Sequence, residues 1–543
     1  MKKLLPVCLL SIFSLNSLCQ HSQLSLSDDF KIAEKESRNQ TVTHSIYHNN
    51  SFYTVANSGS GLHSIFVKLY DAKFAIAISK FDRNMNEIKK FELENGEKKF
   101  GPLVPELFLL NNQLCVAYFQ SDDNKSSFSL YLAVVDADEL SLKETKKICT
   151  IQQENVGIFK LESFANAHLV CIANSADNTK ALVACRTSPN TVQTFVMDND
   201  LNIVHQTTIH TNGSDLDISS GILTGDDVEC LILQSAEETR VVCIGPDGKK
   251  TETKLNAAGN LFPDFTNATL ARDGKHVYIY SSTTESQKDG KGGNGLIIQQ
   301  LDCNTQKLSK PLSYEFSPGF IENICKSGGG DKHKKEYFMF HFTPNLVELD
   351  NGDITILTGL EQTSTNTNQM TNMQGQTHEV AITTIDVGPI IAFFPNKNGK
   401  TYDYELIPRK SSVSKSAQSG SGALQIVQAP GLSHSFADFI ATNIGDEILI
   451  LYNDSEENLS TGANEKTAHS PKDLVVAEAL IGKEKKLQYR KQIGENLKGN
   501  YTYFLGNTIP TSSSSIIFPV GKEGMNFNAR KIFYSNWCFL DIK

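Results

Sequence analysis

Residues 107–136 read LFLLNNQLCVAYFQSDDNKSSFSLYLAVVD, and this stretch decides the fold. It holds three runs rich in β-branched, aromatic and aliphatic residues: Leu107–Leu110, Leu114–Phe119 and Ser127–Asp136. Asn111-Asn112 lies between the first two runs and is typical of a tight hairpin turn. Short runs of this composition, bounded by Asn, Asp, Gly and Ser, predict the strands of an antiparallel sheet.

The same unit recurs along the chain. Two strands are predicted within residues 41–56 and two more within 73–94. Later units start near Asp215, Phe265, Leu346, Ser435 and Tyr501. A small sheet cannot bury both of its faces unless neighbouring sheets cover them. Units of about four strands, repeated at roughly 55–70 residues, therefore predict an all-β fold: a single β-propeller of seven or eight four-stranded blades.

The alternative all-β arrangement is a series of tandem β-sandwich domains. No proline-rich linker divides the chain, so one propeller over residues 20–543 is favoured. No window keeps apolar residues at helical spacing between caps, so no convincing amphipathic helix is expected. Residues 501–543 hold three predicted strands, and Asp29–Lys35 is predicted to supply the strand that completes the last blade and closes the ring.

Five polar stretches interrupt the predicted units and are expected to be long surface loops. They cover residues 285–295, 326–335, 361–377, 411–422 and 455–470. Their Gly, Ser, Asn and Lys content is too polar to pack into a core. Four of the five begin after residue 320. Because surface loops commonly carry binding residues, we expect a functional rim over residues 350–470.

The N-terminus predicts a secretory signal peptide over residues 1–19. Two lysines precede the apolar run Leu4–Leu15, and Ser17-Leu18-Cys19 then offers small residues for cleavage before Gln20. Lipidation of Cys19 is the alternative, although Asn16 and Leu18 do not fit a lipobox. Neither this run nor any later stretch is suited to span a bilayer. The expected location is the periplasm or the cell surface.

Charge and cysteine usage narrow the class of protein further. The formal net charge is −10, and the largest basic block is Lys332–Lys335, which argues against nucleic-acid binding. Two of the eleven cysteines, Cys8 and Cys19, lie in the predicted signal peptide. Four others lie inside apolar strand-like runs: Cys115, Cys171, Cys230 and Cys243. Buried free thiols are favoured for these, and no Cys-x-x-Cys spacing predicts a zinc or thioredoxin-type site. The alternative is that one or two disulfides form in an oxidising compartment.

Three elements in the C-terminal half carry a family resemblance. The first is Leu349–Asp353 followed by a strand and Glu361-Gln362, the second is Ile407-Pro408-Arg409-Lys410, and the third is Tyr452-Asn453-Asp454 with Asn458-Leu459. With them, residues 338–459 resemble a group of uncharacterised secreted Bacteroidetes proteins with propeller-like repeats. Here the tryptophan usual before the second element is absent, and Arg409 separates Pro408 from Lys410. The resemblance implies a fold and a compartment, and no activity.

Candidate binding residues come from the same region. They are Asp350, Asp353, Glu361, Asn453, Asp454, Glu456 and Asn458. The stretch from Asn453 to Asn458 is rich in the oxygen ligands that Ca²⁺ prefers, although it lacks the alternating order of an EF-hand loop. Asn and Asp are also ordinary turn formers, so a loop-anchoring role is the alternative. The thirteen histidines show no metal-ligand spacing, and no cofactor is expected beyond this possible Ca²⁺.

The sequence contains no catalytic constellation. Carboxylate pairs such as Asp226-Asp227 lie in polar turns, and neither a Gly-x-Ser-x-Gly elbow nor a P-loop occurs. We therefore predict a non-catalytic binding or scaffold protein that contacts protein or glycan through the propeller rim. The alternative is a propeller hydrolase acting on polysaccharide or peptide, which would place two carboxylates or a Ser/His pair at one central funnel. A surface adhesin is a third possibility.

Overall fold

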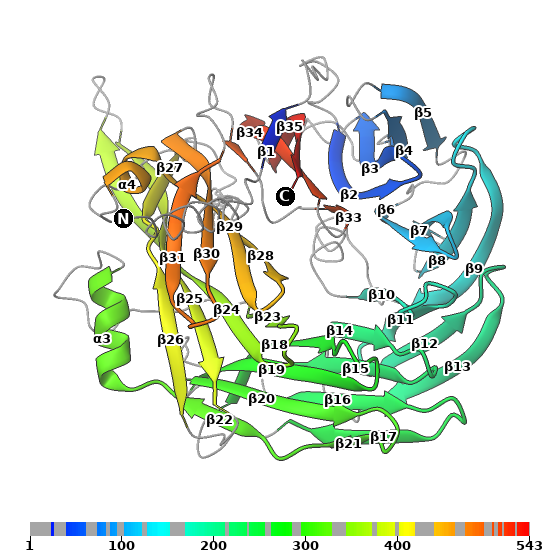
Figure 1. Ribbon diagram of the computed structural model, residues 1–543. Helices are drawn as coiled ribbons and strands as arrows, with labels where there is room; N and C mark the ends of the chain where they lie inside the picture. The colour runs from blue at the N-terminus through cyan, green and yellow to red at the C-terminus, as the bar shows by residue number, and fades with distance from the viewer. Residues whose placement is uncertain are drawn as a thin grey trace, which may run out of the picture.

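The computed structural model describes residues 23–26, 40–60, 73–82, 87–94, 103–121, 127–152, 169–211, 217–235, 238–255, 262–284, 295–327, 344–371, 377–396, 401–418, 439–461, 473–493, 502–503, 509–512, 515–526 and 529–541. Within these ranges the strands pair into eight antiparallel sheets, five with four strands and three with five. The sheets follow one another in chain order around a ring, from blue through green to red (Figure 1). The chain is a β-propeller, and eight sheets correspond to the larger of the two predicted blade numbers.

The first four blades are simple four-stranded meanders. Blade 1 contains β2 (Gln40–His48), β3 (Ser51–Ser60), β4 (Lys73–Phe81) and β5 (Glu87–Glu94). Blade 2 contains β6 (Leu103–Leu110), β7 (Gln113–Ser121), β8 (Ser127–Val135) and β9 (Leu142–Gln152). Blade 3 contains β10 (Val170–Asn174), β11 (Ala181–Ser188), β12 (Thr191–Met197) and β13 (Ile203–His210). Blade 4 contains β14 (Asp217–Leu223), β15 (Glu229–Gln234), β16 (Thr239–Ile244) and β17 (Lys250–Lys254).

Blades 5 and 6 each carry one strand more. Blade 5 contains β18 (Phe262–Leu270), β19 (His276–Thr284), β20 (Gly295–Asp302) and β21 (Lys307–Leu308), with β22 (Leu312–Glu315) also paired to β20. Blade 6 contains β23 (Asn345–Glu348), β24 (Ile354–Thr371), β25 (Thr377–Pro395) and β26 (Tyr402–Ile407), with β27 (Ser411–Gln418) also paired to β25. Blade 7 returns to four strands: β28 (Phe439–Ile444), β29 (Glu447–Ser455), β30 (Leu474–Ile481) and β31 (Leu487–Gln492).

Blade 8 joins the two ends of the chain. It contains β32 (Thr502–Tyr503), β33 (Ile509–Ser512), β34 (Ser515–Asn526) and β35 (Ala529–Asp541), and the N-terminal strand β1 (Gln23–Leu26) pairs with β35. The register runs from Gln23 opposite Asp541 to Leu26 opposite Cys538. An N-terminal strand therefore completes the last blade, as predicted, but the strand is Gln23–Leu26. The predicted segment Asp29–Lys35 lies outside the described residues.

Tight asparagine turns set the hairpin geometry of the early blades. Asn49 and Asn50 have φ values of 46° and 59°, and Asn111 and Asn112 have 47° and 62°. Two consecutive residues with positive φ make the type of turn whose twist matches that of the flanking strands, and asparagine tolerates this conformation. Both turns lie where the sequence predicts them.

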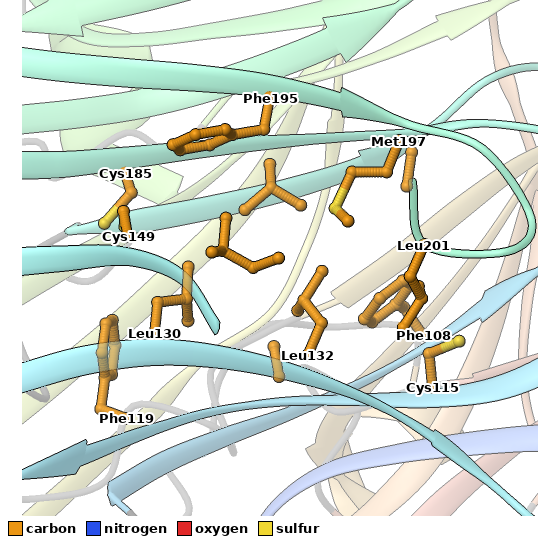
Figure 2. Packing of buried hydrophobic residues seen from close by; sticks show 14 of the residues in the cluster. Phe108, Cys115, Phe119, Leu130, Leu132, Cys149, Cys185, Phe195, Met197 and Leu201 are labelled. Atoms are coloured by element: carbon orange, nitrogen blue, oxygen red, sulfur yellow. The ribbon is translucent and has the colours of Figure 1, made fainter. Parts of the chain in front are cut away.

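Apolar cores fill the spaces between consecutive blades from blade 1 to blade 7. Strand β11 shows how one apolar run contributes side chains to two of these cores. Val183 and Cys185 belong to the core shared with blade 2, whereas Leu182 and Ala184 belong to the core shared with blade 4. Successive side chains of a strand point to opposite faces, so a run that is apolar throughout buries both faces. Figure 2 shows the core between blades 2 and 3.

Two short helices lie among the described residues, where the sequence predicted no convincing helix. Helix α3 (Pro318–Ser327) connects blades 5 and 6, and α4 (Glu456–Thr461) follows β29. Ser317 caps α3 by accepting a hydrogen bond of 3.2 Å from the Phe320 amide, and Pro318 suits the first helical position. Phe320 and Ile324, four residues apart, enter the core between blades 5 and 6. No helix in the described ranges is long and apolar enough to cross a membrane.

Two of the five predicted polar loops contain strands instead. Residues 361–371 continue β24, and residues 411–418 form β27. Pairing of β24 with β25 extends from Ile356 opposite Phe393 to Thr371 opposite Thr377, so the backbone groups on one edge of this polar stretch bond within the hairpin. The prediction failed because it relied on apolar patterning, which a long hairpin of this kind does not need. Residues 285–294, 328–335, 372–376, 419–422 and 462–470 of the predicted loops lie outside the described part.

The cysteines behave largely as predicted. Seven in the described part carry free thiols: Cys115, Cys149, Cys171, Cys185, Cys230, Cys243 and Cys303. All are buried except Cys171, which is half-buried. Burial alone raises the pKa of Cys115 to about 12, so this thiol is an inert part of the core.

Candidate functional site: a buried polar cluster between blades 6 and 7

Two of the sequence elements that carry the family resemblance meet at the junction of blades 6 and 7. The segment Ile407–Lys410 connects β26 to β27, and it lies against the end of β29. The Lys410 amide donates to Asp454 Oδ1 at 3.4 Å. From the neighbouring strand β31, Arg490 Nη1 donates to the Pro408 carbonyl at 2.7 Å. Packing of the two blades thus brings together residues that are more than forty positions apart in the chain.

Asp454 is the centre of this cluster and is fully buried. Besides the Lys410 amide, its Oδ1 accepts from the Ser455 amide at 2.8 Å and from Asn458 Nδ2 at 3.1 Å. Its Oδ2 lies 3.6 Å from Arg490 Nη1. Burial raises the pKa of Asp454, and the hydrogen bonds and Arg490 oppose that rise. Every neighbour named here presents a hydrogen-bond donor to the carboxylate.

The local fold explains why Asn458 reaches Asp454. Strand β29 ends at Ser455, and α4 starts at Glu456 and turns back over the strand end. Asn458 is 1 % exposed, whereas Glu456 points into solvent at the start of the helix. A carboxylate in a first helical turn suits the partial positive charge there. The stretch from Asn453 to Asn458 therefore anchors a strand-to-helix turn, which is the alternative left open by the sequence.

Arg409, the residue that departs from the family pattern, is 1 % exposed and is the largest fully buried side chain in the described residues. Its Nε donates to the Gly388 carbonyl at 3.0 Å. Nη2 lies so close to Gly359 that a Cβ atom there would come within 2.9 Å of it. Gly359 lies at a bulge in the pairing of β24 with β25. The guanidinium is thus seated where glycine makes room for it.

A second set of buried polar groups lies on the other face of blade 7, because Glu478 alternates with Ala477 and Ala479, which face blade 6. Glu478 on β30 is fully buried, accepts from the Tyr489 hydroxyl at 2.8 Å and pairs with Lys491 at 3.0 Å. Burial also raises the pKa of Tyr452 on β29 above its usual range. Each carboxylate therefore has a cationic neighbour, which is the condition under which buried charges are tolerated.

Asp350 and Asp353, two more of the predicted residues, lie outside this cluster. Asp350 is exposed at the turn between β23 and β24, where it pairs with Arg272 of blade 5 and accepts from Asn443 Nδ2 of blade 7 at 3.1 Å. Asp353 is half-buried in the same turn. Glu361 lies in β24 opposite Val387, next to the bulge. The structure therefore brings Asp454 and Asn458 together. Asn453 precedes Asp454 in β29 and points to the opposite face of the strand, and Asp350, Asp353 and Glu456 lie outside the cluster.

Sequence reasoning missed two other carboxylates. Glu106 is half-buried on the first strand of blade 2, just after a bulge that contains Pro105, and burial raises its pKa to about 7. Glu229 of blade 4 is fully buried and lies 2.8 Å from His205 Nδ1 of blade 3, and burial raises the pKa of Glu229. A lone Glu inside an apolar strand is the signal that could have marked both.

No group of three or more His, Cys, Asp or Glu side chains in the described ranges is arranged to hold a metal ion. Glu106 lies in the middle of the first strand of blade 2, and Asp217 begins the first strand of blade 4. Asp217 is engaged in an ion pair of 2.5 Å with Arg186 Nη1. The contacts described above hold blades 6 and 7 and the start of β27 in one fixed arrangement.

Comparison with known proteins adds little beyond the fold. No family model matches the chain, and no curated protein matches it either. Among solved structures it is similar to the β-propeller domain of the trilobed protease from Pyrococcus furiosus, with 9 % identity over 84 % of this chain and 97 % of that one and a TM-score of 0.32.

Two further similar structures are enzymes. A prolyl endopeptidase matches at 10 % identity over 90 % of this chain and 55 % of its own, with a TM-score of 0.36. An α-L-arabinofuranosidase from Fusarium graminearum matches at 6 % identity over 95 % and 98 %, with a TM-score of 0.32. Similarity at these levels does not bear on function, and the propeller assignment rests on the strand pairing described above.

Proposed function

We propose that this chain is a non-catalytic binding protein of the cell envelope that contacts protein or glycan through an arm of blade 6. The arm consists of residues 361–371 of β24, residues 377–387 of β25, and β27. The observation that carries the proposal is that β24 and β25 continue far past their other partners. Strand β23 pairs only with Ile354–Leu357, and β26 only with Ile390–Pro395. Beyond that point the described hairpin is accompanied only by β27 (Figure 1).

The composition of the arm suits a polar ligand. Its first strand reads EQTSTNTNQMT, which offers hydroxyl and amide groups and a single charge. Such groups recognise sugar hydroxyls and peptide backbones through hydrogen bonds. The buried polar cluster supports the arm from below, because β27 begins directly after Arg409 and Lys410. A rigid base lowers the entropy lost on binding.

Export is part of the proposal. Cleavage after Cys19 would leave Gln23–Leu26 in the mature chain, so the strand that closes the ring would survive processing. Fractionation of cells that express the full chain should recover it in the envelope with Gln20 as its first residue, whereas deletion of residues 2–19 should keep it in the cytosol. Equal recovery of both forms from the cytosol would refute this part. Mass analysis of the exported form distinguishes cleavage from lipidation at Cys19.

The outer part of the arm can be removed while the pairing of β24 with β23 and of β25 with β26 is kept. Thr365 and Thr383 are opposite each other, so residues 365–383 can be replaced by Asn-Gly between Ser364 and Thr384. The matched control deletes residues 286–292 from the polar stretch between β19 and β20. Affinity capture from envelope extract, together with a glycan array, should lose its ligands with the shortened arm and keep them with the control. Unchanged binding by the shortened arm would overturn the proposal.

A propeller hydrolase is the second candidate, and Glu106 is the observation that favours it. A carboxyl with a pKa of about 7 is suited to general acid–base chemistry near neutral pH. Polysaccharide and peptide panels should then show turnover by the parent protein that Glu106→Gln abolishes. Absence of turnover by the parent protein would leave the binding proposal as the better account. Turnover that is equal in both proteins would show a catalytic activity that does not use Glu106.

A further inference from the structure

Two cysteines face each other across the central hairpin of blade 4. Cys230 on β15 lies directly opposite Cys243 on β16. At the closed end of this hairpin the Ser235 amide donates to the Glu238 carbonyl at 2.8 Å, so these two residues form a hydrogen-bonded pair. Hydrogen-bonded and non-hydrogen-bonded pairs alternate along an antiparallel ladder. Five positions further on, Cys230 and Cys243 therefore occupy a non-hydrogen-bonded pair.

This position has the geometry that a disulfide requires. Opposite residues of a non-hydrogen-bonded pair have Cα atoms about 4.5 Å apart, and their side chains approach each other most closely there. Disulfides join Cα atoms roughly 4.4–6.8 Å apart. No shift of the backbone is needed to bring the two sulfur atoms into bonding range.

The surroundings favour reaction between these two thiols. Contact with the Cys230 thiol lowers the pKa of Cys243, and Thr251, directly opposite Cys243 on β17, lowers it further. Burial raises the pKa of Cys303, the third cysteine in the same core, to about 12. Cys243 is therefore the better nucleophile of the three, and Cys230 is its nearest partner.

We propose that Cys230 and Cys243 form a disulfide when the chain folds in an oxidising compartment. The Cys243 thiolate attacks the disulfide of a small-molecule or protein oxidant and forms a mixed disulfide, and one oxidant thiol leaves. The Cys230 thiolate then attacks the Cys243 sulfur and releases the second oxidant thiol. Two protons and two electrons leave the cysteine pair, and the oxidant is reduced to two thiols. The proposal is independent of the ligand-binding role given to blade 6.

The disulfide forms during folding and not in the folded protein. Cys230 is 1 % exposed and Cys243 is 2 % exposed, beneath the core shared with blade 5. The two residues are close in sequence and lie in one hairpin, which forms locally before blade 5 packs over it. An oxidant reaches them in that interval and is excluded later.

The experiment uses the mature chain, residues 20–543, refolded in a glutathione redox buffer, then denatured and alkylated without reduction. Peptide mapping should find Cys230 and Cys243 linked, with Cys115 alkylated as an internal free thiol. Reductant should lower the Tm of the parent protein by about 3 °C, because the bond closes a short loop in a large protein. Cys243→Ala should abolish both the linked peptide and this reductant effect. The matched variant Cys303→Ala changes the same core and should keep both.

Three results would overturn the proposal. They are alkylation of both Cys230 and Cys243 after oxidative refolding, a link from either residue to Cys303, and loss of the linked peptide in Cys303→Ala. Refolding in a defined buffer makes the outcome independent of whether the chain is exported. If Cys243→Ala does not fold, Cys230→Ala provides the same test from the other side of the pair.

Discussion

The junction of blades 2 and 3 and the junction of blades 6 and 7 solve the same packing problem in different ways. Between blades 2 and 3 the shared cluster is wholly apolar, and Figure 2 shows Leu130 and Leu132 of one blade facing Phe195 and Met197 of the other. Between blades 6 and 7 an apolar core is joined by the buried polar cluster around Asp454. Apolar packing is tolerant of which neighbour fills the space, whereas a buried ion pair is satisfied only by its own partners. The ion pair and hydrogen bonds of the second junction therefore fix how blades 6 and 7 align. The blade-6 arm extends from this junction.

The largest effect is expected from emptying the apolar junction. Phe195 is 1 % exposed at the centre of that cluster. Phe195→Ala should lower the free energy of unfolding by about 4 kcal/mol, because it removes buried area and leaves a cavity. Thermal and urea unfolding measure the change. Phe195→Leu, the matched control, keeps most of the volume and should lose about 1 kcal/mol. Equal losses for the two variants would mean that this junction does not depend on filling space.

The polar junction should respond to removal of a single partner almost as strongly. Asp454→Ala removes the carboxylate that faces the Arg490 guanidinium and leaves the two amides and the Asn458 side chain without this acceptor, so we expect a loss of about 3 kcal/mol. Asp454→Asn keeps an acceptor oxygen and should lose less, about 1 kcal/mol. The exposed carboxylate of Asp350 provides the control, and Asp350→Ala should lose 0.5 kcal/mol or less. If Asp454→Ala and Asp350→Ala are equally mild, the buried cluster is not what holds these blades together.

The two junctions also differ in how far the sequence predicts them. The apolar one follows from strand-like runs such as Leu114–Phe119, because alternation within one strand already says that both faces are buried. The polar one needs a pairing between Arg490, Lys410 and Asp454 that only the packing of separate blades creates. Local patterns reveal an acidic turn at Asp454 and cannot reveal its partners. A short anchoring turn and a calcium loop therefore look alike in sequence.

Two further features could not be predicted from the sequence, for related physical reasons. The polar stretch 361–371 forms a strand because its backbone pairs with β25, and an apolar pattern was the only strand signal available. The closing strand Gln23–Leu26 is four residues long and gains its partner from the opposite end of the chain. In both cases the stabilising interaction is non-local, so a window of neighbouring residues carries little information about it.

The third prediction concerns Glu106 of blade 2. Its carboxyl has no ionic partner among the described residues. Its folded pKa of about 7 lies above the value near 4.5 of an unperturbed glutamate, so the folded state binds the proton more tightly than the unfolded state. Its contribution to stability is therefore fully present below pH 4.5 and is lost as the pH rises to 7. We expect the loss to be about 2 kcal/mol.

Comparison with Glu106→Gln isolates this effect. The variant cannot ionise at this position, so unfolding midpoints measured from pH 4 to pH 8 should diverge in its favour above pH 5. The two proteins should be similar at pH 4. Parallel curves over the whole range would show that the Glu106 carboxyl is solvated in the folded state.

The smallest effect is expected at an exposed ion pair between blades 5 and 6. Arg272 of blade 5 pairs with Asp350 of blade 6, and their side chains are 46 % and 56 % exposed. Two solvated side chains gain little from such a pair, so Arg272→Ala should lower the free energy of unfolding by about 0.5 kcal/mol or less. Raising the salt concentration from 0.05 to about 1 M should erase that difference, because the Debye length falls to roughly 3 Å. The effect of Asp454→Ala should persist in the same salt, since its partners are shielded from solvent. A salt-sensitive Asp454 together with a salt-insensitive Arg272 would reverse the assignment of which charges are buried in the working protein.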